Sequence, residues 1–146
     1  MRAMVMEEFG SADVLKLQDV QSPEIADGEI LVEAKAIGVN PIDYVARTVG
    51  GPLRPIVEAA LSNQTPVILG WDIAGIVTES KSSAFNPGDK VFALARFPAL
   101  TGGYAEFVAI PANEAVLIPG NLNFEEAAAV PLAALTAWQS LVETAG

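Results

Sequence analysis

The sequence predicts a mainly β fold, in which short strands form a barrel or sandwich and a helical segment follows at the C-terminus. Short apolar or alternating segments recur along residues 1–122, separated by turn-forming residues that include most of the 12 glycines and 10 prolines. Residues 123–146 are instead rich in alanine, which favours helix. With 146 residues, of which 51% are hydrophobic and 18% charged, the chain can form a core. We therefore expect a mainly β domain over 1–122 and a helical connector over 123–146.

Three strands are expected before residue 40. Arg2–Met6 is a short apolar run that ends at two glutamates, and Val14–Val20 partly alternates between apolar and polar residues. Glu29–Val39 places Ile30 and Val32 on one face, as a half-buried strand requires.

The next part of the chain is expected to be partly helical. Pro41 suits the first turn of a short helix over Pro41–Thr48, because its missing N–H is not needed there. Apolar residues within Leu53–Thr65 would allow a second helix, but Pro52 and Pro55 favour an irregular loop. Loops of this kind carry binding more often than packing.

Further strands are expected along the middle of the chain. Pro66–Glu79 is extended in pattern, and the Asn-Pro-Gly-Asp sequence over 86–89 is typical of a turn. Strands follow at Lys90–Ala95, Tyr104–Ile110 and about Ala115–Ile118.

Two helices are expected at the C-terminus. Asn123, with Glu126 three residues later, matches a capping box at the start of the first helix. Pro131 breaks that helix or starts a second one, which reaches Gly146, a residue type that often ends helices. No downstream strand is present for the second helix to pack against, so we expect it to be the truncated start of a further domain.

Composition excludes several classes of function. The chain contains no cysteine and no histidine, which excludes disulfides, thiolate nucleophiles and metal sites built from these residues. The net charge is −10 and no basic residue follows Arg96, so a nucleic-acid partner is not expected. No apolar run approaches the roughly 20 residues of a membrane span, and the N-terminus does not resemble a signal peptide. We expect a cytoplasmic protein without a membrane partner.

Five short blocks of sequence follow one another in this order: Gly38–Asp43, Leu69–Val77, Pro87–Val91, Gly102–Phe107 and Ala128–Ala137. Together they resemble the medium-chain dehydrogenase/reductase superfamily, and within it the zinc-independent quinone oxidoreductase branch. The resemblance implies that residues 1–122 form the GroES-like, partly open β-barrel of the alcohol dehydrogenase-like proteins, with short peripheral helices. It also implies that residues 123–146 begin the connection to a Rossmann domain that is missing from this sequence.

The departures from the zinc-dependent relatives are informative. The zinc alcohol dehydrogenases hold a catalytic zinc ion with a cysteine and a histidine at the positions that are Asn40 and Trp71 here. Their four-cysteine structural lobe is also missing, because only five residues without a thiol join Arg96 to Gly102. The resemblance therefore implies a protein that uses no zinc.

The activity implied by the resemblance is the reduction of quinones or conjugated enones by hydride transfer from NADPH. Without a metal, alcohol oxidation needs another group to take the hydroxyl proton, whereas a quinone or enone has an electron-poor carbon that accepts hydride directly. The intact enzyme is expected to be a homodimer and this fragment a monomer. Because the chain lacks a G-x-G-x-x-G turn, it should not bind NADPH tightly alone. The alternative is a stand-alone, non-catalytic GroES-like binding or scaffold module.

Four residues are candidates for the catalytic and cofactor site. Asn40 either hydrogen-bonds the nicotinamide or substrate, or caps the following helix. The resemblance implies that Thr136 approaches the nicotinamide ring, although a mid-helix threonine can also bond the carbonyl four residues back. Arg47 lies near the cofactor phosphate or is solvated. Tyr44 is either the catalytic proton donor or a packing residue.

The substrate pocket is expected to involve Asn40 and Trp71, with the indole as an apolar wall of the cleft. Structural roles are expected for two carboxylates. Asp43 would lie in the first turn of a helix, where the helix dipole favours negative charge. Asp72 would stabilise the barrel through the backbone or through contacts of the Lys90 type.

Overall fold

The N-terminal part of the chain forms a two-stranded antiparallel sheet. The computed structural model of the chain describes residues 1–145. Strand β1 (Arg2–Met6) pairs with β2 (Leu15–Asp19), with Met4 opposite Leu17. The predicted strands at these positions are confirmed.

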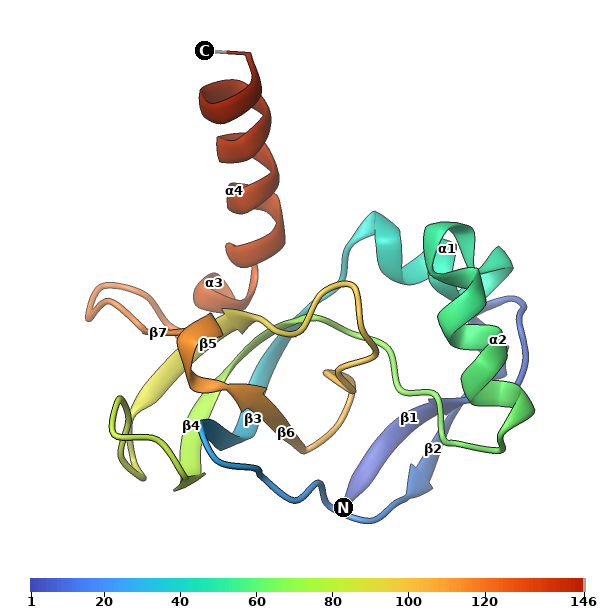
Figure 1. The fold of residues 1–146 in the computed structure, drawn as a ribbon, viewed down its shortest axis with the longest axis horizontal. Coiled ribbons are helices and arrows are strands. Elements are labelled where there is room, and N and C mark those ends of the chain that lie inside the picture. Colours follow the sequence, from blue (N-terminus) through green and yellow to red (C-terminus); the bar gives the residue numbers. More distant parts are fainter. Residues whose placement is uncertain (146) are drawn as a thin grey trace.

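A five-stranded antiparallel sheet forms the centre of the molecule (Figure 1). Its strands are β3 (Glu29–Gly38), β4 (Asp72–Ser80), β5 (Lys90–Leu94), β6 (Phe107–Pro111) and β7 (Ala115–Leu117). They lie in the order β6-β3-β4-β5-β7, and the outer strands β6 and β7 do not pair with each other. The sheet is therefore not a closed barrel, and the expected mainly β, partly open architecture with short helices is confirmed.

The hydrophobic core of this sheet follows from the alternation in its strands. Ile30 and Val32 on β3 are fully buried and pack with Ile73 and Val77 of β4 and with Val91 of β5. Each side chain of this kind contributes about 1.5–3 kcal/mol when it leaves water completely. The apolar face of the sheet is thus the main source of its stability.

Two helices lie beside the small sheet. Helix α1 (Pro41–Val49) begins at the proline that the sequence indicated. Helix α2 (Arg54–Ser62) corrects the expected irregular loop over Leu53–Thr65. Pro55 lies in the first turn of α2, where a helix needs no N–H donor, so it starts the helix instead of breaking it. Val57 on α2 is fully buried against a second core.

Two strands are shorter than expected. The extended segment before β4 forms an isolated bridge between Val67 and Met6, and its further backbone hydrogen bonds, such as Tyr104 N to Leu69 O, do not make a ladder, which begins at Asp72. Residues 104–106 do not extend β6, because Glu106 accepts from Ala34 of β3 but donates to Arg2 of β1. This segment therefore joins the two sheets.

The C-terminal segment contains a short helix that packs on the sheet and a longer one that leaves it. In α3 (Phe124–Ala128) the predicted capping box is present: Glu126 N donates to Asn123 Oδ1 over 2.7 Å, and Asn123 N donates to Glu126 Oε2 over 2.9 Å. Ala127 and Ala128 are buried against the sheet. The domain boundary at residue 123 stays a prediction.

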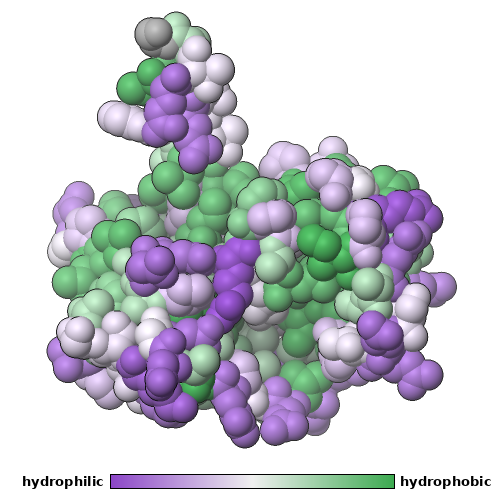
Figure 2. All heavy atoms as spheres, in the orientation of Figure 1, coloured by the Kyte–Doolittle hydropathy of each residue, from purple (hydrophilic) through white to green (hydrophobic). Residues whose placement is uncertain are grey.

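Helix α4 (Pro131–Trp138) continues into the π-helical segment η4 (Gln139–Thr144) and projects away from the sheet (Figure 1). Figure 2 shows hydrophobic residues at the foot of this projection, and Leu135 is 45% exposed. The expected helix end at Gly146 lies outside the described residues. Within residues 1–145, no helix has both the length and the apolar character that crossing a membrane requires.

Candidate functional site

A cavity of about 420 Å³ lies between α1, the turn after β5 and the start of α4, and we call it the α1–α4 cavity. Its volume is within the usual range for small-molecule sites. The side chains that shape it include Ile42, Phe97, Glu114, Leu132, Leu135 and Thr136. The lining is mixed: apolar side chains share it with the Thr136 hydroxyl, the Gln139 carboxamide and the Glu114 carboxylate.

A buried carboxylate at the edge of this cavity connects three elements. Asp72, at the start of β4, is 1% exposed. Its Oδ2 accepts from Asn40 Nδ2, just before α1, over 2.9 Å. Leu132 N, in the first turn of α4, donates to Asp72 Oδ1 and Oδ2 over 3.1 and 3.3 Å. Asp72 thus fixes the start of α1 relative to the start of α4.

Burial is the main electrostatic influence on this carboxylate. It raises the pKa of Asp72 above the ordinary value of 3.8, while the hydrogen bonds from Asn40 and Leu132 oppose the rise. Asp72 has a structural role, as expected, but its hydrogen bonds join Asn40 to the backbone of α4 and not the strands of the barrel to one another. Lys90 does not take part in this role of Asp72, because its ammonium group lies over the Phe124 ring, 5.6 Å from the ring centroid.

The close approach at Asp72 depends on a glycine. A Cβ atom on Gly38, at the end of β3, would lie 2.6 Å from Ala128 O and 2.8 Å from Asp72 Cβ. Only glycine lets β3, α3 and Asp72 meet at this distance. The glycine of the first sequence block is therefore part of the framework of the site.

Asp43 has the structural role that the sequence indicated. Its Oδ2 accepts from Asn40 N over 2.8 Å at the start of α1. The side chain is 3% exposed, and Oδ1 has no hydrogen-bond partner among the described residues. Burial raises the pKa of Asp43, and nearby backbone N–H groups and the Tyr104 hydroxyl oppose the rise. The pKa of Tyr104 is itself raised, first by burial and then by the charge of Asp43.

This arrangement predicts how the Asp43→Asn variant depends on pH. A carboxyl whose pKa is higher in the folded state takes up its proton preferentially in that state, so its protonation stabilises the fold as pH falls from neutral towards 3.8. Asp43→Asn removes this gain. We therefore compare the free energy of unfolding of the wild type with that of the variant. The wild-type value minus the variant value should become larger as pH is lowered from neutral to about 4. Urea unfolding at several pH values measures it, and a difference that falls as pH falls would contradict the assignment.

Tyr44 and Arg47 lie on another side of α1. Both line a second cavity, of about 370 Å³, with Tyr104 and Met4. Arg47 Nη1 donates to Gly10 O over 2.6 Å, so its charge anchors the loop after β1. The structure thus separates these two residues from the α1–α4 cavity.

Trp71 does not form a wall of the cleft, which corrects the expectation from the sequence. It is fully buried, and its indole N–H donates to Ala99 O over 2.7 Å. A large aromatic side chain gains most when it is buried with its N–H paired, and both conditions hold here. The aromatic ring that lines the cavity is instead that of Phe97, which meets Trp71 edge to face. Phe97 was not among the predicted site residues. The sequence feature that could have indicated it is an aromatic residue in a turn that contains proline.

Thr136 lies in the middle of α4 and lines the α1–α4 cavity. Among the hydrogen bonds of residues 1–145, its hydroxyl makes none with the carbonyl of Leu132, four residues earlier. Asn40 is linked to the same helix through Asp72 and Leu132 N. Of the predicted site residues, Thr136 lines the cavity, whereas Asn40 does not line it and is linked to α4 only through Asp72.

The cavity can accept a small molecule beside the Phe97 ring, with the Thr136 hydroxyl and the Gln139 carboxamide as polar groups that could orient it. In the part of the chain that the structure describes, no three Asp, Glu, His or Cys side chains are grouped as a metal site. Zinc independence stays a prediction.

Comparison with known proteins places this geometry in a family. The model of the alcohol dehydrogenase GroES-like domain matches residues 26–120. A quinone oxidoreductase from Lama guanicoe is 34% identical over 148 residues, which is 99% of this chain and 42% of that protein. A 2-methylene-furan-3-one reductase from Solanum lycopersicum is 35% identical over 154 residues, covering 100% of this chain and 38% of that protein.

Solved structures agree with these relatives. The quinone oxidoreductase from Coxiella burnetii superposes with a TM-score of 0.88 and 37% identity, over 99% of this chain and 45% of that one. The quinone oxidoreductase of Escherichia coli complexed with NADPH gives 0.82 and 32%, over 99% and 41%. The chain thus spans less than half the length of these proteins. It belongs to the alcohol dehydrogenase GroES-like domain family, and its relatives include quinone oxidoreductases of the medium-chain dehydrogenase/reductase superfamily.

Proposed function

We propose that the chain forms the substrate-side part of an NADPH-dependent oxidoreductase that reduces quinones or conjugated enones by hydride transfer. The observation that carries the proposal is the Asp72 carboxylate, which fixes Asn40 relative to α4, the helix whose Thr136 lines the α1–α4 cavity. The names of the relatives support it, since they include quinone oxidoreductases and a reductase of an unsaturated furanone.

The described residues fit the nicotinamide end of NADPH and not its phosphates. Thr136 and Gln139 line the cavity and offer a hydroxyl and an amide of the kind that orients a polar ring substituent. The same role for Asn40, which Asp72 links to α4, is part of the proposal. No arginine or lysine lines the α1–α4 cavity in residues 1–145, and its charged lining group is the Glu114 carboxylate. The phosphates would therefore need groups from outside this chain. When bound, NADPH supplies the hydride.

The side chains of this domain would position the acceptor and control its contact with water. The aliphatic groups of Ile42, Leu132 and Leu135 exclude water from part of the cavity, which strengthens polar interactions inside it. Reduction of a carbonyl acceptor leaves negative charge on its oxygen, and the hydroxyl of Thr136 can donate a hydrogen bond to that oxygen. Tyr44 lines the other cavity, so we assign the proton to solvent and not to Tyr44.

The proposal is tested by following NADPH oxidation with 1,4-naphthoquinone as acceptor, using the longest polypeptide that carries this chain. We expect acceptor-dependent oxidation by that polypeptide. The 146-residue chain should give no micromolar NADPH binding in titration calorimetry, because it lacks a glycine-rich phosphate turn. A longer polypeptide that binds NADPH but reduces neither quinones nor enones would contradict the proposal, and would favour the non-catalytic module instead.

A further inference from the structure

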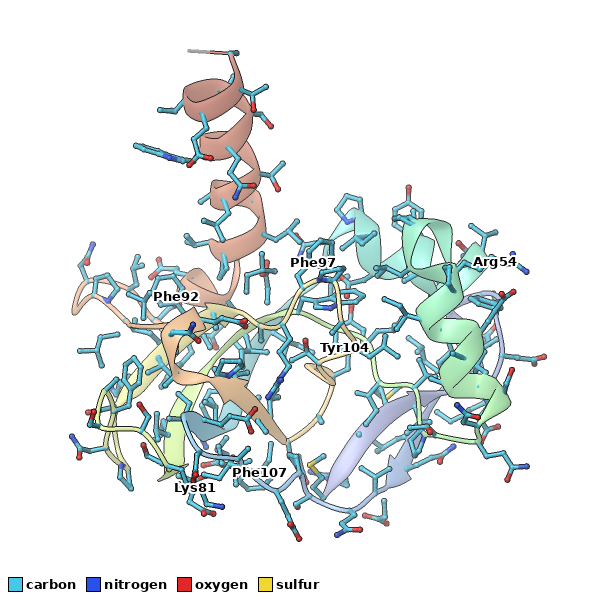
Figure 3. All side chains as sticks on the ribbon, viewed as in Figure 1. Arg54, Lys81, Phe92, Phe97, Tyr104 and Phe107 are labelled. Carbon is cyan, nitrogen blue, oxygen red and sulfur yellow. The ribbon has the colours of Figure 1, made fainter. Side chains whose placement is uncertain are left out.

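The turn after β5 places an aromatic ring in the α1–α4 cavity. Phe97 is 43% exposed and is the one aromatic residue among those that line this cavity in the described part of the chain. Figure 3 shows Phe97 near the foot of α4, between that helix and α1. A partly exposed phenylalanine in a cavity of this size is a candidate contact for a ligand.

Hydrogen bonds fix the turn that carries this ring. Ala95 N donates to Trp71 O over 2.8 Å, which ties the beginning of the turn to the core. Ala99 N donates to Arg96 O over 2.7 Å and closes the turn around the ring. Thr101 Oγ1 then donates to Ala95 O over 2.5 Å. The backbone that carries the ring is therefore fixed before any ligand arrives, which lowers the entropy cost of binding.

Trp71 supports the ring from the core side. The centroids of the Phe97 and Trp71 rings are 5.8 Å apart and their planes meet at 79°, a T-shaped contact. In a T-shaped pair at least one face of the Phe97 ring is not covered by its partner. Trp71 is itself fixed by burial and by its hydrogen bond to Ala99 O. Phe97 thus has a free face on a rigid support.

Aliphatic and polar side chains share the cavity with that ring. Ile42 of α1 and Leu132 and Leu135 of α4 offer apolar contacts to a flat ligand. Thr136, Gln139 and Glu114 are the polar lining groups, and they could meet the oxygen atoms of such a ligand. Aromatic rings prefer offset-stacked or edge-to-face partners, whereas a non-aromatic ring gains only the apolar contact. A planar ring system therefore uses this cavity better than a puckered one of similar polarity.

We propose that Phe97 is a specificity-determining residue that stacks on the acceptor and makes the site prefer fused aromatic quinones to non-aromatic enones. The inference rests on the proposed function, because it assigns the α1–α4 cavity to the acceptor. It concerns ring recognition only and involves no group transfer.

The test is an NMR titration of the 146-residue chain without cofactor, with 1,4-naphthoquinone and, separately, cyclohex-2-enone. Since the chain has no cysteine, the quinone meets no thiol that it could alkylate. We expect naphthoquinone to shift the resonances of residues 95–101. Phe97→Leu should weaken naphthoquinone binding by about three- to tenfold and change cyclohexenone binding by less than about twofold. Phe97→Tyr, which keeps the ring, should bind both like the wild type.

Phe107→Leu is the matched control, because this half-buried phenylalanine lies on β6 and does not line the cavity. It should leave both affinities unchanged. Three results would each overturn the inference. Phe97→Leu could lose affinity for both ligands equally, or it could bind naphthoquinone as the wild type does. In the wild type, naphthoquinone could leave the resonances of residues 95–101 unshifted. No hydride is transferred without NADPH, so this result is independent of the oxidation assay. A failed assay with the expected affinities would refute only the proposed function.

Discussion

Replacing Gly75 with alanine is expected to lower the free energy of unfolding by about 3 kcal/mol, the upper end of the usual cost of overpacking. Gly75 lies on β4, where a Cβ atom would be 2.2 Å from Glu33 O and 2.7 Å from Val32 Cγ1. The nearest of these atoms belongs to the backbone of β3, so relief requires the two central strands to move apart. Urea unfolding followed by circular dichroism measures the change.

Gly120→Ala is the matched control for this variant. A Cβ atom at Gly120 would meet no atom within 4 Å, and its backbone does not need a positive φ. We expect a change within about 0.5 kcal/mol. Equal stabilities of Gly75→Ala and Gly120→Ala would contradict the close packing of β3 on β4.

Removal of the Asp72 carboxylate is expected to have the second large effect. Asp72→Ala leaves Asn40 Nδ2 and Leu132 N without their acceptor, at a cost of about 2–3 kcal/mol in the free energy of unfolding. The amide hydrogen of Leu132 should also lose protection against exchange, because its hydrogen bond to Asp72 is gone. Hydrogen exchange followed by NMR identifies this residue directly.

Asp89→Ala provides the comparison for Asp72. Asp89 also accepts a backbone N–H, from Asn86 over 2.8 Å, but it does so in an exposed turn where water can replace it. We expect a cost of about 1 kcal/mol or less. If Leu132 stayed protected in Asp72→Ala, the link between Asp72 and α4 would be refuted.

Local signals in the sequence were enough for much of the fold. The strands β1, β3 and β5 follow from their apolar patterns, and the start of α3 follows from the Asn123 and Glu126 pair. Helix α2 could not be recognised, because a proline that starts a helix and a proline that breaks one look the same without the neighbouring packing. Here Val57, buried in the second core, decides in favour of the helix.

The site was harder to predict than the fold. Trp71 stands in an apolar run without alternation, so the sequence does not tell whether its side chain faces the cleft or the core. Ile42 and Asp43 are neighbours in the chain, yet they line different cavities because successive helical residues point about 100° apart. The distribution of α1 residues between the two cavities depends on tertiary packing. Asn40 and Asp72 meet only once β3 and β4 pair.

We propose that Asn40, held by Asp72, belongs to the reacting site and that Tyr44, which lines the other cavity, does not. The direct measurement compares kcat for NADPH-dependent naphthoquinone reduction in Asn40→Ala and Tyr44→Phe, made in the longest polypeptide that carries this chain. Corrected for the folded fraction, Asn40→Ala should lose about tenfold or more, because the reacting groups are no longer held in place, and Tyr44→Phe should match the wild type. A full loss in Tyr44→Phe, with Asn40→Ala unaffected, would contradict the account and move the site to the cavity beside Tyr104.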